Sequence, residues 1–175
     1  AAFREVQGEL VSAEANVRRL YHGTSAFAVR QVIEDGFRLP RSAGMFGKGV
    51  YFADVPLKSW QYSTIGFMLV CDVALGREKR CPNGDRSLTL STLGDFDSAQ
   101  GLARNQGGVL RNPEWIIYRH SQAIPRTLLW VCKANDRERV IQNLGRDARF
   151  ARRVVRFIFM LLLSFSSSVL TVIVL

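Results

Sequence analysis

The stretch at residues 67–75 is the sequence feature that most constrains the fold. It reads Phe-Met-Leu-Val-Cys-Asp-Val-Ala-Leu, and Asp72 is its only charged residue. A near-continuous apolar run of this length predicts a β-strand that is buried on both faces. This run is the strongest strand prediction in the chain.

Shorter apolar runs predict further strands at residues 20–21, 50–53, 115–118 and 127–132. Two polar, glycine-rich stretches are expected to be loops, at residues 40–49 and, for the most part, 76–111. Strands do not alternate with long helices as they do in a doubly wound fold. The pattern therefore predicts an α+β domain built from several short strands.

Three helices are predicted from apolar periodicity and from end signals. The first covers residues 3–18, where apolar residues recur at helical spacing although Gly8 weakens the pattern. The second begins after Ser25, a suitable N-cap, and stops at Gly36. The third begins near Pro56, a residue that fits the first turn of a helix, and runs to about residue 62.

Composition limits the class of protein. The apolar fraction of 47% excludes global disorder, and 175 residues suffice for one domain with an appendage. The net charge of +9 is densest from Arg146 to Arg156, so it indicates either polyanionic partners or simply a solvated face. The three cysteines form no disulfide or zinc pattern, which predicts a reducing compartment and no metal site.

Three segments carry the functional signal. They are Leu-Tyr-His-Gly-Thr at residues 20–24, a glycine-rich strand and helix at residues 44–62, and Asn-Pro-Glu-Trp-Ile-Ile-Tyr at residues 112–118. The middle segment reads Gly-Met-Phe-Gly-Lys-Gly-Val-Tyr-Phe-Ala and continues to Lys-Ser-Trp-Gln-Tyr. Together they resemble the catalytic domain of the poly(ADP-ribose) polymerase family over about residues 18–133. The resemblance implies an ADP-ribosyltransferase-like α+β fold, with antiparallel β-sheets flanking an NAD cleft.

The resemblance also implies a catalytic triad of His22, Tyr51 and Glu114 and NAD⁺ as a substrate, without a metal. Such an enzyme moves ADP-ribose to a protein acceptor, or to nucleic acid, and releases nicotinamide. The transition state at the ribose carbon is similar to an oxocarbenium ion, as in glycoside cleavage. A carboxylate beside that sugar stabilises the positive charge, and Glu114 is the residue expected to do so. His22 is expected to bond the adenosine-side ribose.

Further residues are expected to bind the nicotinamide end of NAD⁺. The resemblance implies that Tyr51 and Tyr62 sandwich the ring and that backbone groups of Gly23 meet the carboxamide. A Cβ at Gly23 would block that close approach. Ser59 is expected to donate a hydrogen bond to the carboxamide oxygen. Lys58 is expected near the acceptor or the phosphates.

The chain divides into four expected regions. Residues 1–19 are a polar helical lead-in without a secretory signal, and residues 20–135 are the catalytic domain. A basic linker covers residues 136–156. Residues 157–175 carry no charge and just reach the length of a membrane-spanning helix, so a tail anchor facing the cytosol is one hypothesis. An artefact of the gene model or a buried segment is the equally weighted alternative, and we expect an intracellular location, cytoplasmic or nuclear.

Two other functions fit parts of the pattern. An RNA 2′-phosphotransferase shares a similar Tyr-His-Gly-Thr opening, and a basic chain would suit RNA. A non-catalytic module that binds NAD or ADP-ribose would need no complete triad. Taken alone, Glu114 at a strand start and His22 at a strand end would each be read as structural residues, and only the combined pattern favours catalysis. His120 lies past the glutamate strand and is expected at the surface.

Overall fold

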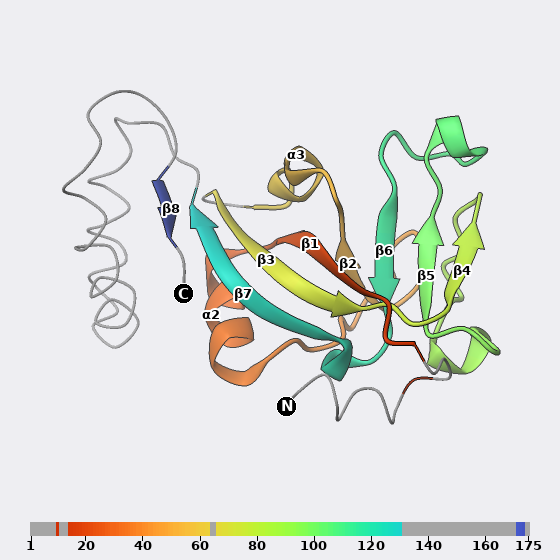
Figure 1. Ribbon diagram of the computed structural model, residues 1–175, viewed down its shortest axis with the longest axis horizontal. Helices are drawn as coiled ribbons and strands as arrows, with labels where there is room; N and C mark the ends of the chain where they lie inside the picture. The colour runs from red at the N-terminus through yellow and green to blue at the C-terminus, as the bar shows by residue number, and fades with distance from the viewer. Residues whose placement is uncertain (1–9, 11–13, 64–65, 131–170, 174–175) are drawn as a thin grey trace.

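The computed structural model describes residues 10, 14–63, 66–130 and 171–173, which form two four-stranded sheets and two short α-helices (Figure 1). The first sheet has the strand order β1 (Val17–Gly23), β3 (Phe67–Ala74), β7 (Ala123–Trp130), β8 (Thr171–Ile173). The second sheet has the order β2 (Val50–Phe52), β6 (Glu114–Ile117), β5 (Ser98–Gly101), β4 (Glu78–Cys81). The α+β class expected from the sequence is confirmed.

The apolar run at residues 67–75 forms β3, a central strand of the first sheet. β3 pairs antiparallel with β1 on one side and with β7 on the other, and most of its side chains are buried. Its single charge is accommodated at the surface, because the Asp72 carboxylate lies 3.0 Å from Arg19 and 2.7 Å from Arg126. The prediction of a buried strand is therefore confirmed.

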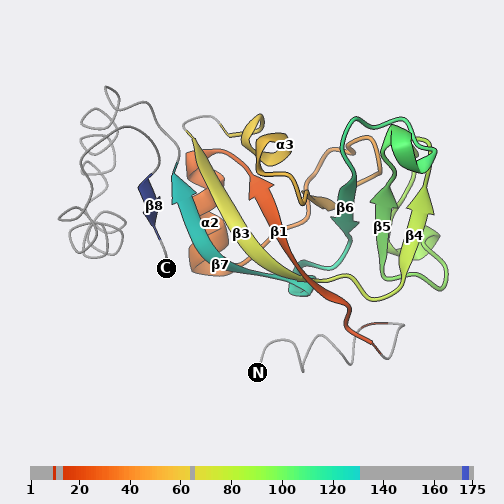
Figure 2. The ribbon, with the colours of Figure 1, turned by 45° about the horizontal axis from the view of Figure 1, so that its top comes forward.

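Both helices that the structure describes begin where the sequence predicts. The hydroxyl of Ser25 accepts the Ala28 N–H at 3.2 Å, and α2 (Ala26–Asp35) ends at Gly36, whose φ is 84°. Pro56 opens α3 (Pro56–Trp60). Figures 1 and 2 show α2 behind β3 and β7, where Val29 and Val32 are buried in the core between the helix and the sheet.

The helix predicted over residues 3–18 is wrong at the residues that the structure describes. Val17 and Arg18 belong to β1, where they pair with Ala74 and Val73. β1 pairs with β3 along its whole length, and this tertiary pairing outweighs a weak local helix preference. Residues 1–9 and 11–13 lie outside the described residues.

Most of residues 76–111 lie outside helices and strands, as expected, but the stretch also contains strands that the sequence did not predict. Two strands lie there, β4 and β5, and they pair with each other in parallel. Only Cys81 of β4 is buried, and β5 reads Ser-Ala-Gln-Gly. Strands of four small or charged residues lack the apolar alternation that predicts a strand. This parallel pair is the exception to the otherwise antiparallel pairing of both sheets.

The second sheet has two apolar faces, because alternate residues of a strand point to opposite sides. Phe52 and Trp115, which are register partners, face a core shared with the first sheet. Tyr51 and its partner Ile116 face a second, smaller core that includes Phe46. The glycine-rich loop at residues 40–49 therefore packs on the second face.

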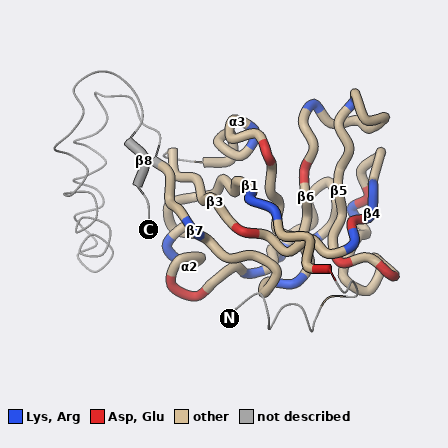
Figure 3. Tube along the Cα trace, viewed as in Figure 1, with Lys and Arg blue, Asp and Glu red and all other residues tan. Residues whose placement is uncertain are grey.

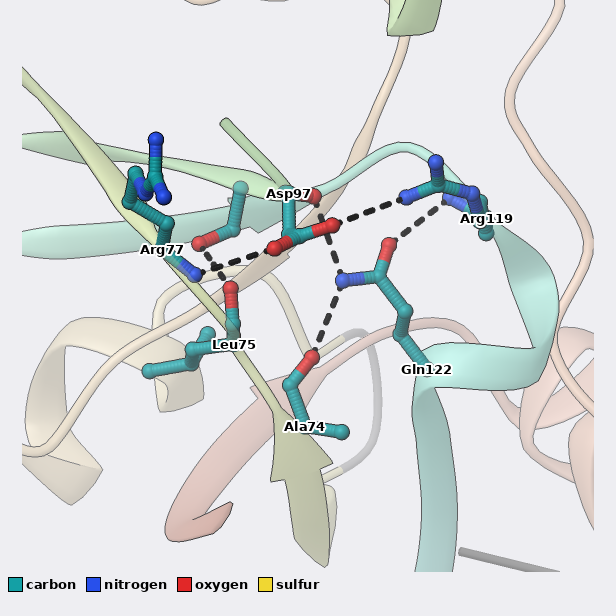
Figure 4. A network of polar contacts seen from close by, with 7 residues as sticks. Ala74, Leu75, Arg77, Asp97, Arg119 and Gln122 are labelled. Atoms are coloured by element: carbon teal, nitrogen blue, oxygen red, sulfur yellow. Dashed lines mark hydrogen bonds and ion pairs between the residues drawn. The ribbon is translucent and has the colours of Figure 1, made fainter. Parts of the chain in front are cut away.

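A buried polar network ties the two sheets together (Figure 4). The carboxylate of Asp97, which is fully buried, accepts the Arg77 N–H at 3.1 Å and lies 3.5 Å from the Arg119 guanidinium. The Gln122 amide donates to the Ala74 carbonyl at 2.9 Å and to the Asp97 carbonyl at 3.2 Å. These contacts link the end of β3 to the start of β5.

The sequence analysis raised two possible signs of partners: the net positive charge of the chain and the uncharged segment at residues 157–175. Figure 3 shows basic residues on β1, on β4 and in the loops of the described chain, with acidic residues between them along the trace. In the tail, residues 157–170 and 174–175 lie outside the described residues, whereas Thr171–Ile173 form a strand paired with β7 rather than part of a helix. Of the helices in the described ranges, none has the length and apolar character needed to cross a bilayer.

Candidate active site

All the residues predicted for the site line one cavity of about 610 Å³. Its lining includes His22, Gly23, Tyr51, Lys58, Ser59, Tyr62 and Glu114. These residues come from β1, β2, α3, the segment after α3 and β6. A cavity of this size suits a small organic ligand with several polar groups. Segments far apart in the sequence therefore converge as the motifs predict.

Glu114 and Tyr51 lie on the same face of the second sheet. Tyr51 is the register partner of Ile116, and Glu114 precedes Ile116 by two residues, so the two side chains are diagonal neighbours. Glu114 is only 6% exposed, while Tyr51 is half-buried. The buried carboxylate of Glu114, at the first residue of β6, therefore lines the cavity close to the ring of Tyr51.

An ion pair holds the Glu114 side chain. The Lys58 ammonium lies 3.1 Å from a carboxylate oxygen of Glu114, and the two side chains are 17% and 8% exposed. The same ammonium lies 6.0 Å from the ring centre of Tyr62. Lys58 thus lies beside the carboxylate, a position that its sequence context alone did not identify.

His22 is fixed in one tautomer by its neighbours. Its Nδ1 lies 2.8 Å from the Tyr51 carbonyl, which can only accept, so Nδ1 carries the proton and Nε2 has the free lone pair. The ring packs against Phe37 and Phe52 with centroid distances of 5.2 and 5.4 Å. Burial lowers the pKa of His22, and the hydrogen bond to Tyr51 only partly offsets this. The neutral ring therefore offers an acceptor to a hydroxyl group.

Gly23 presents free backbone groups to the cavity. Tyr21 exchanges both its backbone hydrogen bonds with Ala53, at 2.8 and 3.0 Å, so it faces away from β3. Groups two residues apart on a strand point the same way, so the N–H and C=O of Gly23 also face away from β3. They lie just beyond the Ala53 bridge, where the cavity begins.

A second contact, which the sequence did not reveal, also requires glycine at position 23. A Cβ built there would lie 1.7 Å from the Ser59 carbonyl oxygen. The backbone of β1 and the backbone of α3 are therefore in direct contact, which only glycine permits. This contact fixes α3, and with it Lys58 and Ser59, against the strand that carries His22.

Ser59 is buried and already has a partner. Its hydroxyl donates to the Tyr21 carbonyl at 2.8 Å. The predicted hydrogen bond to a ligand carboxamide therefore requires the hydroxyl to rotate away from Tyr21. In the structure as described, Ser59 links α3 to β1.

The ring of Tyr51 is held at its hydroxyl by the glycine-rich loop. The Phe46 N–H donates to this hydroxyl at 2.8 Å, and the hydroxyl donates to the Gly47 carbonyl at 3.0 Å. Burial raises the pKa of Tyr51 to about 12, so it stays protonated at neutral pH. Tyr62, in contrast, is 57% exposed, although it also lines the cavity.

Sequence reasoning missed several residues that shape the site. Phe37 packs on His22, and its position directly after the helix stop at Gly36 was the available signal. Tyr118 bonds the loop that holds Tyr51, and it follows Ile116 by the same two-residue spacing that separates Ile116 from Glu114. His120 is exposed, as expected. Within the described ranges, no three His, Cys, Asp or Glu side chains are grouped to hold a metal ion.

One protein family and several known proteins are similar in sequence to this chain. The family model of the poly(ADP-ribose) polymerase catalytic domain matches residues 2–133. The chain is 37% identical over 115 residues to the mouse (Mus musculus) protein mono-ADP-ribosyltransferase PARP3, covering 59% of this chain and 21% of that protein. It is 28% identical over 146 residues to mouse PARP4, also named a protein mono-ADP-ribosyltransferase, covering 73% of this chain and 7% of that protein.

A third relative is poly [ADP-ribose] polymerase 1 of Caenorhabditis elegans, which is 37% identical over 100 residues, or 51% of this chain and 10% of that protein. The chain therefore spans about a fifth or less of the length of these relatives. The family match covers most of the chain and contains every residue of the cavity described above. The chain belongs to the poly(ADP-ribose) polymerase catalytic domain family.

Proposed function

We propose that the chain transfers ADP-ribose from NAD⁺ to an acceptor protein and releases nicotinamide. The observation that carries this proposal is the convergence of His22, Tyr51 and Glu114 on one cavity. The relatives support it, because their names describe ADP-ribose transfer. The family match also disfavours an RNA 2′-phosphotransferase.

The cavity has a volume and polar lining groups that suit NAD⁺. Its volume of about 610 Å³ lies within the range of small-molecule sites. One part is lined by α2 and the loop after it, through Gln31, Arg38 and Ser42, and suits the adenosine half. The other part contains Gly23 and the two tyrosines, where a flat aromatic amide fits between rings and a backbone donor–acceptor pair.

At the nicotinamide part, aromatic rings and backbone groups act together. A pyridinium ring stacked on Tyr51 or Tyr62 gains about 0.5–2 kcal/mol per contact. The N–H and C=O of Gly23 match the carbonyl and amine of a carboxamide. Neutral Nε2 of His22 accepts a hydrogen bond from a ribose hydroxyl. These contacts orient the sugar with its reacting carbon toward Glu114.

Glu114 supplies the charge that the transfer step needs. As the bond between ribose and nicotinamide breaks, nicotinamide leaves with the bonding electrons and the sugar becomes positive. The carboxylate stabilises that charge and takes the proton of the acceptor nucleophile as the nucleophile attacks the same carbon. The Lys58 ammonium balances the carboxylate before substrate arrives.

The experiment that tests the proposal is incubation of the whole chain with NAD⁺ labelled in its adenine half, together with candidate acceptor proteins. Denaturing gels should show label bound covalently to protein in the presence of the wild-type chain. NAD⁺ that binds without any labelled protein would instead support a module that binds NAD or ADP-ribose without catalysis.

We also propose an intracellular location, supported by the two described cysteines, Cys71 and Cys81, which are buried free thiols. Free thiols are typical of reducing compartments. The hypothesis of an anchor at residues 157–175 is tested by fusing residues 150–175 to a soluble reporter and fractionating cells. A reporter found wholly in the soluble fraction rejects the anchor.

A further inference from the structure

Tyr118 lies outside the cavity lining, yet its hydroxyl is bound to the loop beside the cavity. It directly follows β6, the strand that Glu114 opens, and is 2% exposed. Its hydroxyl donates to the Phe46 carbonyl at 2.6 Å. Burial raises the pKa of Tyr118, so the hydroxyl keeps its proton and remains a donor.

The other polar group of Phe46 is bound to Tyr51. The Phe46 N–H donates to the Tyr51 hydroxyl at 2.8 Å, and that hydroxyl donates to the Gly47 carbonyl at 3.0 Å. One loop residue is therefore joined at its carbonyl to Tyr118 and at its amide to Tyr51. The hydroxyl of Tyr118 reaches the hydroxyl of Tyr51 through a single amino acid.

Close packing leaves this link little freedom to relax. A Cβ at Gly44 would lie 2.5 Å from the Tyr51 hydroxyl, and one at Gly101 would lie 2.5 Å from the Phe46 ring. A Cβ at Gly49 would lie 3.2 Å from the Tyr118 ring. Because densely packed groups transmit displacement, a shift of Phe46 must move the Tyr51 ring.

We propose that Tyr118 is a positioning residue for nicotinamide recognition: through Phe46 it sets the angle and depth at which the Tyr51 ring meets the nicotinamide group. This inference rests on the proposed function. Tyr118 does not line the cavity, so its effect is confined to the part of the ligand that Tyr51 contacts. ADP-ribose, which lacks nicotinamide, is bound independently of it.

The test compares two ligands on the Tyr118→Phe variant of the whole chain. Isothermal titration should show that nicotinamide binding is about three- to tenfold weaker, because the variant lacks the hydrogen bond from Tyr118 to Phe46 that helps to position Tyr51. ADP-ribose affinity should stay within about twofold of wild type. Equal loss for both ligands, or no loss for either, overturns the inference.

Two further variants distinguish positioning from general destabilisation. Ser98→Ala removes another buried hydroxyl-to-carbonyl bond, the 2.7 Å bond from Ser98 to Leu75, and should lower stability without changing the ratio of the two affinities. Tyr51→Phe should reproduce the selective loss. Combining Tyr51→Phe with Tyr118→Phe should weaken nicotinamide binding less than the product of the single effects, because both act on one link; full additivity contradicts the link.

The same titrations separate this inference from the proposed function. If wild-type chain binds neither nicotinamide nor ADP-ribose, the proposed function fails and the inference fails with it. If the wild type binds both and Tyr118→Phe binds nicotinamide as tightly as the wild type, only the inference fails.

Discussion

The Lys58 ammonium lies 3.1 Å from the Glu114 carboxylate, and both side chains are largely withdrawn from water. Lys58 comes from α3 and Glu114 from the first position of β6, so the pair joins a helix to the second sheet in the lining of the cavity. A charge enclosed in this way is stable only while its partner is present. The ion pair is therefore a structural element of the site as well as a chemical one.

Lys58→Met should lower the free energy of unfolding by about 2–4 kcal/mol, because it leaves the enclosed Glu114 carboxylate without a counter-charge. Urea unfolding at pH 7 measures this. Adding Glu114→Gln removes the orphaned charge, so the double variant should be at least about 1 kcal/mol more stable than Lys58→Met alone. Strictly additive losses would show that the two groups do not interact in solution.

Gly23→Ala should destabilise the chain by about 2 kcal/mol or more, because the new Cβ meets the Ser59 backbone and forces α3 outward. Nicotinamide binding should weaken in the same variant, since α3 carries Ser59 and Lys58. Gly94→Ala is the control, because its φ of 65° is strained for alanine but its Cβ would meet no atom within 4 Å. It should lose only about 1 kcal/mol and no binding. Equal effects of both substitutions would contradict the backbone contact.

Acidification should reveal the burial of His22. Burial lowers its pKa below the ordinary value of 6.5, so the folded state binds the proton less readily than the unfolded state. The contribution to stability is complete above pH 6.5 and is lost as the pH falls from 6.5 to the lower pKa of the folded state. Between these two pKa values, the contribution of His22 to the free energy of unfolding should fall by up to about 1.4 kcal/mol for each unit that the pH falls.

Urea unfolding of wild type and His22→Gln between pH 5 and 8 isolates this contribution as the difference in pH slope. The matched control is His120→Gln, which replaces the other, exposed histidine and should keep the wild-type slope. A slope that disappears in His120→Gln and persists in His22→Gln would reverse the assignment.

Asp97→Asn should lower the free energy of unfolding by about 3 kcal/mol, because it leaves the largely buried Arg119 guanidinium without its counter-charge. Asp72→Asn makes the same chemical change in a carboxylate whose arginine partners are 69% and 48% exposed. It should lose less than about 1 kcal/mol. The network of Figure 4 does not join the sheets as described if the two variants lose equal stability.

Much of the site could be predicted from the sequence because its residues lie at element ends that have local signals. Ser25, Gly36 and Pro56 mark the bounds of the helices, and the apolar run at residues 67–75 marks β3. The family resemblance then brought the three motif segments together. No local pattern could show that Lys58 pairs with Glu114, because the partners are joined only by tertiary structure.

The parts that could not be predicted are those in which tertiary contacts replace local preference. β4 and β5 are too short and too polar to show alternation, and they are strands because β6 and the buried Asp97 network hold them. Val17 and Arg18 lie in a strand because they pair with β3, although the apolar periodicity around them predicts a helix. Tyr118 is read from sequence as one more apolar strand residue, and only its hydrogen bond to Phe46 shows its connection to the site.

Release of nicotinamide from NAD⁺ in the presence of acceptor protein, measured for wild type and Glu114→Gln, tests the central claim most directly. The account predicts that the wild type releases nicotinamide and that Glu114→Gln releases it at least about 100-fold more slowly, while NAD⁺ binding is retained. Equal rates for the two chains, with equal binding, would contradict the assignment of Glu114 as the catalytic carboxylate.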